Sequence, residues 1–492
     1  MEIYMNQTLI LDNEVSQKDH LIFREPSVQE QRSDKRTRKL ETETPTNSGS
    51  IRVAILSTLL LRVASRTSFV LLGFYLGEHF TSATVVAVVL EAFYISELVL
   101  APMVGGLSDR LGRKPFLLSA PLVAGGAALF FLAATLLFPH PHSSPFDIHL
   151  GVLLLMVLVG RLLEGAATAL NTPTSLSYIT ETARGSDAMR ARVLTAFEVA
   201  TAAGLALAVP FGGEVSSLMG TWGFFVVLGL HGINGILIAC VLKENTQRQA
   251  QVNRPHSLLA SLSIIRYKGI LTFLPAWLSI NTLVGAWLTL CTIILTYPEP
   301  AAHLRHPGQL LYGGFSHGAA SLLFGGFGLL FLGGMGLWLL VMPHLRRTTV
   351  MLIGLGGLSI SIVALTLING LGSDPTRVFA NPQPVLFLLL PMVVLGVLLL
   401  SGFTPASLNH MGVIAELLPG KRGAMMGLYS VVMGVGQLIG AALGGLSVDL
   451  GGFYGLMIFS VAMGLISLSS VLYLRVKGQD LIGNGHEESI RV

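Results

Sequence analysis

The sequence predicts an all-α integral membrane protein, with twelve transmembrane helices arranged as two pseudo-symmetric six-helix bundles. The first observation is composition: of 492 residues, 52% are hydrophobic and only 12% are charged, whereas soluble domains carry about 25% charged residues. The second observation is a series of long apolar segments, and the third is an internal repeat. Most of this chain therefore cannot face water.

A helix that crosses a bilayer needs roughly 20 mainly apolar residues. Reading the chain with that window predicts twelve such helices, six on each side of a polar stretch. Their expected ranges are 51–76, 83–107, 115–138, 149–176, 193–213, 221–242, 270–296, 319–342, 349–370, 385–408, 422–446 and 452–475. They are called segments 1 to 12 below.

The remaining residues define the expected domain boundaries. Residues 1–50 are polar, without a signal-peptide pattern, and we expect a disordered cytoplasmic tail. The two bundles are expected at 51–242 and 270–475, joined by a cytoplasmic linker at 243–269, and residues 476–492 form a second cytoplasmic tail.

The distribution of Lys and Arg predicts the orientation in the membrane. Loops that follow even-numbered segments carry fifteen of these residues, and loops that follow odd-numbered segments carry only Arg305 and Arg377. Because basic residues accumulate in cytoplasmic loops, both termini are expected in the cytoplasm and the protein in the plasma (inner) membrane. The same rule explains the net charge of +4 without a nucleic-acid partner.

The two halves of the chain repeat at a constant offset of 232 residues. Thr172-Pro173-x-Ser175-Leu176 recurs as Thr404-Pro405-x-Ser407-Leu408. Glycines follow in the same register, with Gly204 matching Gly436. Segments 4 and 5 therefore have counterparts in segments 10 and 11, as parallel structural repeats require.

The segment from Gly105 to Leu117 reads G-G-L-S-D-R-L-G-R-K-P-F-L and lies between two apolar runs. Its spacing of glycines and charges closely resembles the loop between helices 2 and 3 of the major facilitator superfamily. The resemblance implies a membrane transporter. The loop at Met342–Arg347 is the expected second copy, and it keeps only the basic pair.

The resemblance implies a conformational latch in this loop. Asp109 would cap the start of segment 11 near Gly423, where helix amides favour an anion, and Arg113 would pair with Glu181 at the end of segment 4. The alternative is that these charges only fix the topology. The latch residues are Gly105, Asp109, Arg110, Gly112, Arg113, Lys114 and Glu181.

Segments 4 and 5 carry two further motifs. Arg161, followed four residues later by a glycine, resembles the family's R-x-x-x-G motif, which is linked to proton coupling in antiporter branches. Glu164 lies on the same helix face and can pair with it locally, so a structural pair is the alternative. In segment 5, Gly204, Pro210, Gly212 and Gly213 resemble the antiporter signature, although Val209 replaces the glycine before the proline. These residues otherwise bend and pack a helix.

Segments 1 and 2 place four charges deep in the membrane: Arg62, Arg66, Glu91 and Glu97. Such charges are costly and usually face the bundle interior or a water-filled cavity. Arg62 and Glu97 fall at matching depth. Glu97 is the leading candidate for a proton carrier, because desolvation favours its neutral form and a nearby arginine favours its charged form. On a continuous helix the two acids lie about 120° apart, so only one is expected to meet the arginines. A buried structural ion pair is the alternative.

Segments of the second half carry few charges inside the membrane. Trp277, Asn281, Trp287 and Gln437 are instead the candidates for lining a substrate cavity. A charged first half and an apolar, aromatic second half favour an amphiphilic or lipophilic substrate.

The function predicted from these observations is alternating-access export of a small organic molecule, with protons as the coupling ion and no other cofactor or metal. One alternative is uptake of an anionic metabolite bound by Arg62 and Arg66, and another is a non-transporting sensor or assembly factor on the same fold. The sequence lacks a phosphate-binding loop and a nucleophile–base pair, so an enzyme is not expected. The expected partners are the substrate and the lipid bilayer, with the protein a monomer.

Overall fold

The computed structural model describes residues 48–139, 148–182, 187–242, 265, 268–298, 301–371, 383–416 and 422–478. All regular structure in these ranges is helical. The first half contains α3 (Ser48–His79), α4 (Ala83–Glu91), α5 (Phe93–Leu111), α6 (Lys114–Leu137), α7 (Ile148–Thr182), α8 (Asp187–Met219) and α9 (Gly223–Val241). The second half contains α11 (Lys268–Thr296), α12 (Ala301–Arg305), α13 (His317–Val341), α14 (Arg347–Gly370), α15 (Gln383–Leu400), α16 (Phe403–Glu416) and α17 (Arg422–Val476).

Ten continuous helical stretches in the described residues are long and apolar enough to cross a membrane. Two of them, Val199–Val241 with 43 residues and Val431–Val476 with 46, are about twice the length of one crossing. Each contains a glycine with positive φ, Gly220 at +55° and Gly452 at +62°, a conformation that other residues adopt only with strain. Division of both stretches at these turns would give the twelve crossings that the sequence predicts, and that number stays a prediction.

Two predicted helices are interrupted. The helix expected at 83–107 is divided into α4 and α5 at Ala92, where the Ile95 amide donates to the Ala92 carbonyl in a tighter i to i+3 bond of 3.0 Å. The helix expected at 385–408 is divided into α15 and α16 at Gly402, where a Cβ would lie 2.5 Å from the indole of Trp338. Both interruptions arise from local backbone geometry that the apolar pattern does not contain.

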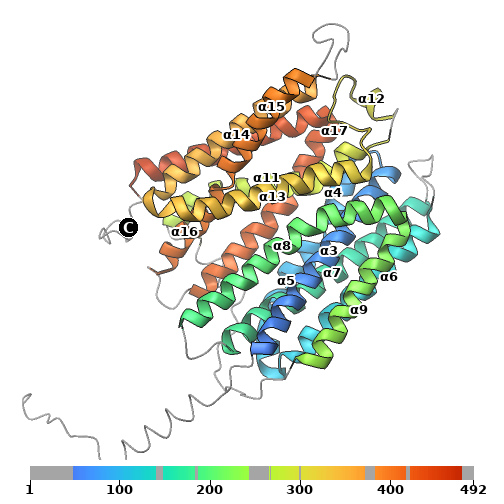
Figure 1. Ribbon diagram of the computed structural model, residues 1–492, viewed down its shortest axis with the longest axis vertical. Coiled ribbons are helices and arrows are strands. Elements are labelled where there is room, and N and C mark those ends of the chain that lie inside the picture. The colour runs from blue at the N-terminus through green and yellow to red at the C-terminus, as the bar shows by residue number, and fades with distance from the viewer. Residues whose placement is uncertain are drawn as a thin grey trace, which may run out of the picture.

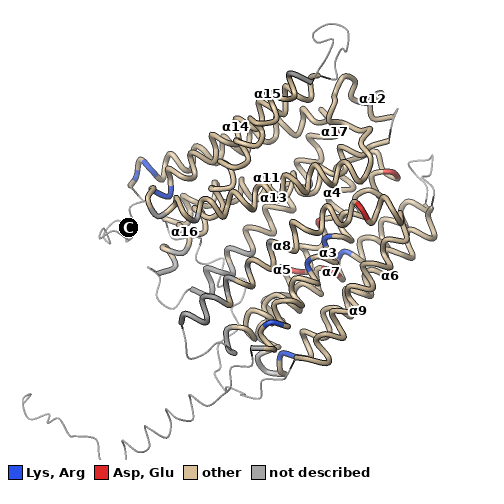
Figure 2. Tube along the Cα trace, in the orientation of Figure 1, with Lys and Arg blue, Asp and Glu red and all other residues tan. Residues whose placement is uncertain are grey.

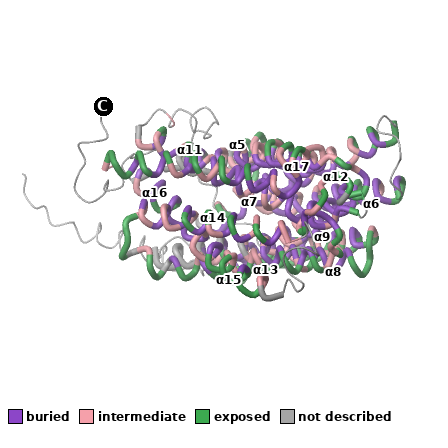
Figure 3. The backbone as a smooth tube through the Cα atoms, turned by 90° about the horizontal axis from the view of Figure 1, so that it is seen from above, coloured by how far each residue is buried: buried purple, intermediate pink, exposed green. Residues whose placement is uncertain are grey.

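The helices form two groups that follow the two halves of the chain. In Figure 1 the first half, blue to green, lies together on one side and most of the second half, yellow to red, on the other, while part of α17 runs beside α4. Figure 3 shows buried residues concentrated between the helices and exposed residues on their outer surfaces. Many exposed side chains are large and apolar, such as Leu155, Leu322 and Phe387, as expected of helices that contact lipid.

We call the face that holds Ser48 and Val476 the terminal face, and the opposite face, which holds the α3–α4 turn and the bend of α17 at Gly452, the distal face. The first described helix begins at Ser48, three residues before the predicted start. The predicted tails at 1–50 and 476–492 and the linker at 243–269 lie largely outside the described residues.

Candidate functional site

Among the described residues, six charged side chains lie inside the first half, away from both faces. Arg62 and Arg66 lie on α3, Glu91 on α4, Glu97 on α5, and Arg161 and Glu164 on α7. Figure 2 shows charged positions of both signs among these helices, whereas the described parts of the second-half helices are uncharged through their middles. The helices of the first half therefore bring together all six charges predicted to lie within the membrane.

Arg66 begins a chain of hydrogen bonds that crosses from the first half to the second. Its Nη2 donates to the Tyr94 hydroxyl over 3.1 Å, and that hydroxyl donates to Oε1 of Gln437 on α17 over 2.5 Å. Tyr94 and Gln437 are both buried. An arginine on α3 is thus joined to the second half through a tyrosine that the sequence analysis did not identify.

Glu91 makes a second buried contact between the halves. Its side chain is fully buried, and Oε1 accepts a hydrogen bond of 2.5 Å from the Thr289 hydroxyl on α11. Its Oε2 is buried without a hydrogen-bond partner among the described residues. Arg66 acts on this carboxyl electrostatically, so a change in its protonation alters both a buried charge balance and a contact between the halves.

Glu97 is partly exposed, and its Oε2 also lacks a hydrogen-bond partner among the described residues. Arg62 and Arg66 both lie within electrostatic range of it, and the match in depth of Arg62 and Glu97 stays a prediction. Arg62 itself donates to the Thr172 hydroxyl over 3.2 Å.

The expectation that only one of the two acids meets the arginines stays a prediction, although Arg66 lies within electrostatic range of both. The 120° estimate assumed a continuous helix, and the interruption at Ala92 between the acids removes that condition. The arrangement is loose: among the described residues, no ion pair within 4.0 Å joins either arginine to either acid.

Arg161 and Glu164 make the local contact predicted for them. The Arg161 Nη1 is paired with Oε2 of Glu164, and both side chains are almost fully buried. The Arg161 Nε also donates to the Leu90 carbonyl over 2.7 Å, and its guanidinium lies 5.3 Å from the ring centroid of Phe69. Because this pair is satisfied within its own surroundings, the geometry resembles a structural ion pair more than an available proton site.

The segment 5 residues pack α8 against its neighbours. A Cβ at Gly204 would lie 2.7 Å from Cβ of Arg62, and one at Gly212 would lie 3.1 Å from Cβ of Val70, both on α3. Toward the second half, Pro210 lies against Gly325, and Gly213 against Ser321, where a Cβ would approach to 2.0 Å. The small residues thus allow α8 to approach both halves closely.

The predicted latch loop is described in part. Gly112 ends α5 with φ of +98°, which explains the glycine at this position. The Arg113 guanidinium donates to the Ser177 carbonyl near the end of α7 over 2.7 Å, and Lys114 to the Ala239 carbonyl of α9 over 3.2 Å. Gly105 faces Pro173 of α7.

The side chains of Asp109, Arg110 and Glu181 lie outside the described set. The proposed contacts of Asp109 with segment 11 and of Arg113 with Glu181 therefore stay predictions.

An apolar cavity of about 230 Å³ lies between α8 of the first half and α11, α13, α14 and α15 of the second. Four aromatic side chains line it, Trp287, Phe324, Phe327 and Phe331, together with aliphatic residues and a single serine, Ser361. Trp287 is oriented by a 3.0 Å hydrogen bond from its indole nitrogen to the Ser460 hydroxyl. The cavity has the shape and chemistry to hold an apolar group.

Only Trp287 of the four predicted cavity residues lines this cavity. Asn281 donates to the Trp277 carbonyl over 2.7 Å and packs against Gly436 of α17, where a Cβ would lie 2.7 Å from that of Asn281. Gln437 belongs to the chain from Arg66, as described above. Asn281 therefore lies in the contact between α11 and α17, Gln437 in the contact between α17 and the first half, and Trp277 stacks on Phe273 within α11.

The fold and the buried charges define a multi-pass membrane transporter, and comparison with known proteins identifies its family. The model of the Major Facilitator Superfamily matches residues 54–373 and 310–490, and the chain belongs to this superfamily. The resemblance noted in the loop at Gly105–Leu117 is thereby confirmed.

Two curated relatives are similar over part of their length. The bacillibactin exporter of Bacillus subtilis (strain 168) is 29% identical over 142 residues, which is 29% of this chain and 31% of the relative. The tetracycline resistance protein, class G, of Vibrio anguillarum is 28% identical over 167 residues, 34% of this chain and 37% of the relative. The chain thus spans about a third of the length of each.

Solved structures support the fold. A nucleoside transporter, NupG, aligns with a TM-score of 0.60 at 14% identity, covering 85% of this chain and 99% of that one. A D-xylose-proton symporter aligns with a TM-score of 0.57 at 15% identity, covering 86% of this chain and 96% of that one. At these identities the likeness concerns the fold alone.

Proposed function

We propose that this protein is a proton-coupled exporter of a small amphiphilic or lipophilic molecule that works by alternating access. The observation that carries the proposal is the pair of carboxyl groups, Glu91 and Glu97, each with one buried oxygen that lacks a described hydrogen-bond partner and each acted on by Arg66. A carboxyl at such a site gains or loses a proton when its distance from the arginine changes, because an opposite charge favours the ionised form and burial the neutral form.

The contacts of the pair supply the link to conformation. Glu91 is hydrogen-bonded to Thr289, and Arg66 is linked to Gln437 through Tyr94. The acid and the arginine are thus both connected to the second half, Glu91 directly and Arg66 through a tyrosine. Movement of one half against the other therefore changes the surroundings of the acids. That coupling is the physical requirement for exchange of a proton against a substrate.

The apolar cavity favours a lipophilic or amphiphilic substrate. Its aromatic lining offers dispersion contacts and one hydroxyl, Ser361, and it lies between α8 and the second half. Two relatives named as an exporter and a drug-resistance protein are in keeping with this substrate class and direction.

Uptake of an anionic metabolite is favoured less by the charge balance. Arg62, Arg66 and Arg161 lie among three glutamates. Arg62 and Arg66 already donate to Thr172 and Tyr94. A non-transporting sensor or assembly factor would have no reason to keep charges at this depth, where they are costly.

The proposed orientation places the terminal face in the cytoplasm, with the protein a monomer in the plasma membrane. It is tested with single cysteines at Leu304 on the distal face and Lys477 on the terminal face, both exposed, in a chain whose Cys240 and Cys291 are replaced. In intact cells a membrane-impermeant maleimide should label the cysteine at 304 and not the one at 477. The reverse pattern would invert the proposed direction of transport.

Transport itself is tested in proteoliposomes that contain a pH-sensitive dye. Lipophilic cations, lipophilic anions, neutral amphiphiles and small hydrophilic anions are added in turn, and substrate-induced proton movement is recorded against protein-free liposomes. Proton movement with amphiphiles alone supports the proposal. A response restricted to hydrophilic anions would favour the uptake alternative, and substrate flux without proton movement would remove proton coupling.

A further inference from the structure

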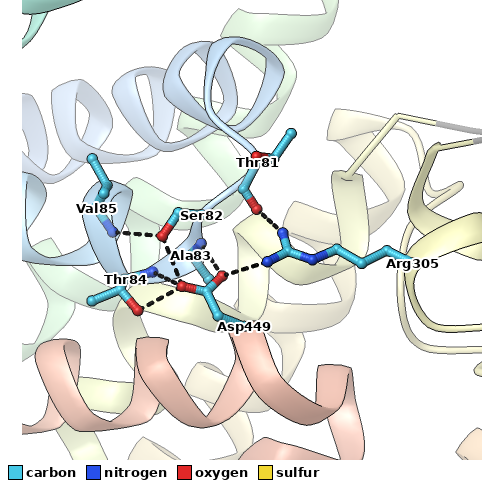
Figure 4. Close-up of polar contacts among 7 residues, drawn as sticks. All are labelled: Thr81, Ser82, Ala83, Thr84, Val85, Arg305 and Asp449. Atoms are coloured by element: carbon cyan, nitrogen blue, oxygen red, sulfur yellow. Dashed lines mark hydrogen bonds and ion pairs between the residues drawn. The ribbon is translucent and has the colours of Figure 1, made fainter. Parts of the chain in front are cut away.

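At the distal face, one carboxylate of the second half binds the first turn of a helix in the first half. Asp449, near the bend of α17, accepts four hydrogen bonds from the start of α4, shown in Figure 4. Its Oδ1 accepts from the Ala83 amide over 2.7 Å. Its Oδ2 accepts from the Ser82 hydroxyl over 2.7 Å, the Thr84 amide over 3.1 Å and the Thr84 hydroxyl over 2.6 Å.

These bonds satisfy the amides that a helix leaves unpaired at its first turn. Ala83 and Thr84 donate to Asp449, and Val85 donates to the Ser82 hydroxyl over 3.3 Å. The negative charge also lies at the positive end of the helix dipole. The start of α4 is therefore completed by a residue from the other half of the protein.

Arg305 strengthens the same contact from α12. Its Nη1 donates to the Thr81 carbonyl of the first half, and its Nη2 lies 3.5 Å from Oδ1 of Asp449. The arginine thus contacts the backbone of the first half and the carboxylate of the second at once. Asp449 and Arg305 are 15% and 37% exposed, so water can replace these bonds when the halves separate.

The backbone that presents Asp449 is fixed from within the second half. Gln309 accepts from the Phe453 amide over 2.7 Å and donates to the Gly451 carbonyl over 3.1 Å, on both sides of Gly452, which has φ of +62°. This clamp holds the bend of α17 three residues after Asp449. The carboxylate is therefore presented by a fixed turn.

Other contacts show that the halves meet closely at this face. A Cβ at Gly445 of α17 would lie 2.6 Å from Cα of Thr84. His317 of α13 stacks on Phe74 of α3 with ring centroids 4.2 Å apart. Separation of the halves here breaks the Asp449 bonds, because their donors and acceptor lie on opposite sides of the contact.

We propose that Asp449, Arg305 and the start of α4 form a distal latch that holds the two halves together at this face and must open once in each transport cycle. The segment that carries Asp449 reads G-G-L-S-V-D-L-G at 444–451, close to G-G-L-S-D-R-L-G at 105–112 on the terminal face. Related short sequences thus lie on opposite faces, one at the end of α5 on the terminal face and one just before the bend of α17 on the distal face, and the two helices contact each other.

The latch is tested by measuring the distance between the halves at the distal face. Spin labels are placed at Leu218 of α8 and Leu304 of α12, both exposed, in full-length protein lacking Cys240 and Cys291 and held in phosphatidylethanolamine and phosphatidylglycerol nanodiscs. Double electron–electron resonance gives the distance distribution without a substrate. Asp449→Asn should raise the population of the longer-distance component about tenfold, because the amide nitrogen that replaces one carboxylate oxygen cannot accept a hydrogen bond and the negative charge at the start of α4 is lost.

Arg305→Ala should shift the distribution in the same direction by a smaller factor, and Glu214→Gln, an exposed acid on the same face, is the matched control that should leave it unchanged. If Asp449→Asn fails to fold, Thr84→Ala removes a single donor and should still lengthen the distribution. Unchanged distances in folded Asp449→Asn or Thr84→Ala overturn the latch. The proposal rests on alternating access, but this test reads conformation alone, so its result is separate from any failure to detect proton-coupled transport.

Discussion

The two halves of this transporter share a fold and an internal repeat but differ in what they bury. Among the described residues, the first half holds six charged side chains at depth, while the second half supplies most of the cavity lining, including Trp287 and three phenylalanines. Burying charge is costly in a membrane and burying aromatic side chains is not. The cost in the first half indicates a role that apolar side chains cannot perform, and the second half is free to bind an apolar group.

The contacts between the halves follow the same division. At depth, the first half supplies Glu91 and Tyr94, and the second half supplies neutral partners, Thr289 and Gln437. A neutral partner keeps the hydrogen bond whether the acid is charged or protonated, because a hydroxyl both donates and accepts. The second half can therefore stay bonded to Glu91 through a change in its protonation without carrying a charge of its own.

The largest effect is expected when a carboxyl group in the first half can no longer gain or lose a proton. Glu97→Gln mimics the protonated form permanently, so flux driven by a pH gradient should be abolished, whereas substrate binding and downhill exchange should persist. One pH unit corresponds to about 1.4 kcal/mol, which sustains about a tenfold substrate gradient per proton, and that gradient should disappear. Dye-loaded proteoliposomes provide the measurement.

The matched control for this substitution is Glu214→Gln, which removes an exposed acid outside the cluster. Glu91→Gln is the next candidate, because Thr289 can still bond to the amide and the fold is retained. Glu164 is the third candidate for the proton carrier, after Glu97 and Glu91. An unaltered pH dependence in Glu97→Gln would make that carboxyl structural and move the search to the other two.

The second effect separates a structural charge pair from a functional one. Arg161→Met or Glu164→Met leaves a buried charge without its partner, and each should lower the free energy of unfolding by about 3 kcal/mol. The double replacement should recover much of that loss, because no unpaired charge remains. Thermal unfolding of all four proteins gives the cycle. A double variant that folds but has lost pH-driven flux would contradict the structural interpretation of this pair.

The third effect concerns the apolar half. Trp287→Ala removes the largest aromatic surface of the cavity, and burial of such a side chain against a ligand contributes about 1.5–3 kcal/mol, so the substrate Kd should rise about 10- to 100-fold. Ser460 still donates to the Leu456 carbonyl over 2.8 Å, so its hydroxyl is not left unpaired. Trp222→Ala, on an exposed outer surface, is the control, and equal affinity in both variants would place the substrate elsewhere.

The sequence predicted the spans, the repeat and the positions of the six charges within the first-half helices because each follows from hydrophobicity or spacing along one helix. The contact of Arg161 with Glu164 is an example, since residues three apart on a helix share a face. The match in depth of Arg62 and Glu97, which stays a prediction, needed only the rise per residue and an antiparallel pair of helices.

Tyr94, Thr289 and Asp449 were missed for a common reason: each acts on a residue of the other half. Their partners are 343, 198 and between 365 and 367 residues away along the chain, and no local pattern specifies how the halves dock. An available signal for Asp449 was its position just before Gly451-Gly452, since an acid beside a turn often caps a helix. The interruption at Ala92 had no signal, because neither proline nor glycine is present there.

The smallest expected effect tests the difference between the two copies of the loop motif, complete at 105–114 in the first half and reduced to a basic pair in the second. Asp109→Asn should lower turnover a few-fold with little change in binding, because a latch shifts a conformational equilibrium without contacting the substrate. Arg346→Gln, in the exposed second copy, should leave both unchanged. Initial rates and Kd for each variant, with cysteine accessibility on the terminal face, give the comparison. Equal effects of the two substitutions would mean that both loops serve only to set the topology, and the functional asymmetry of the halves would then be confined to the buried charges and the cavity.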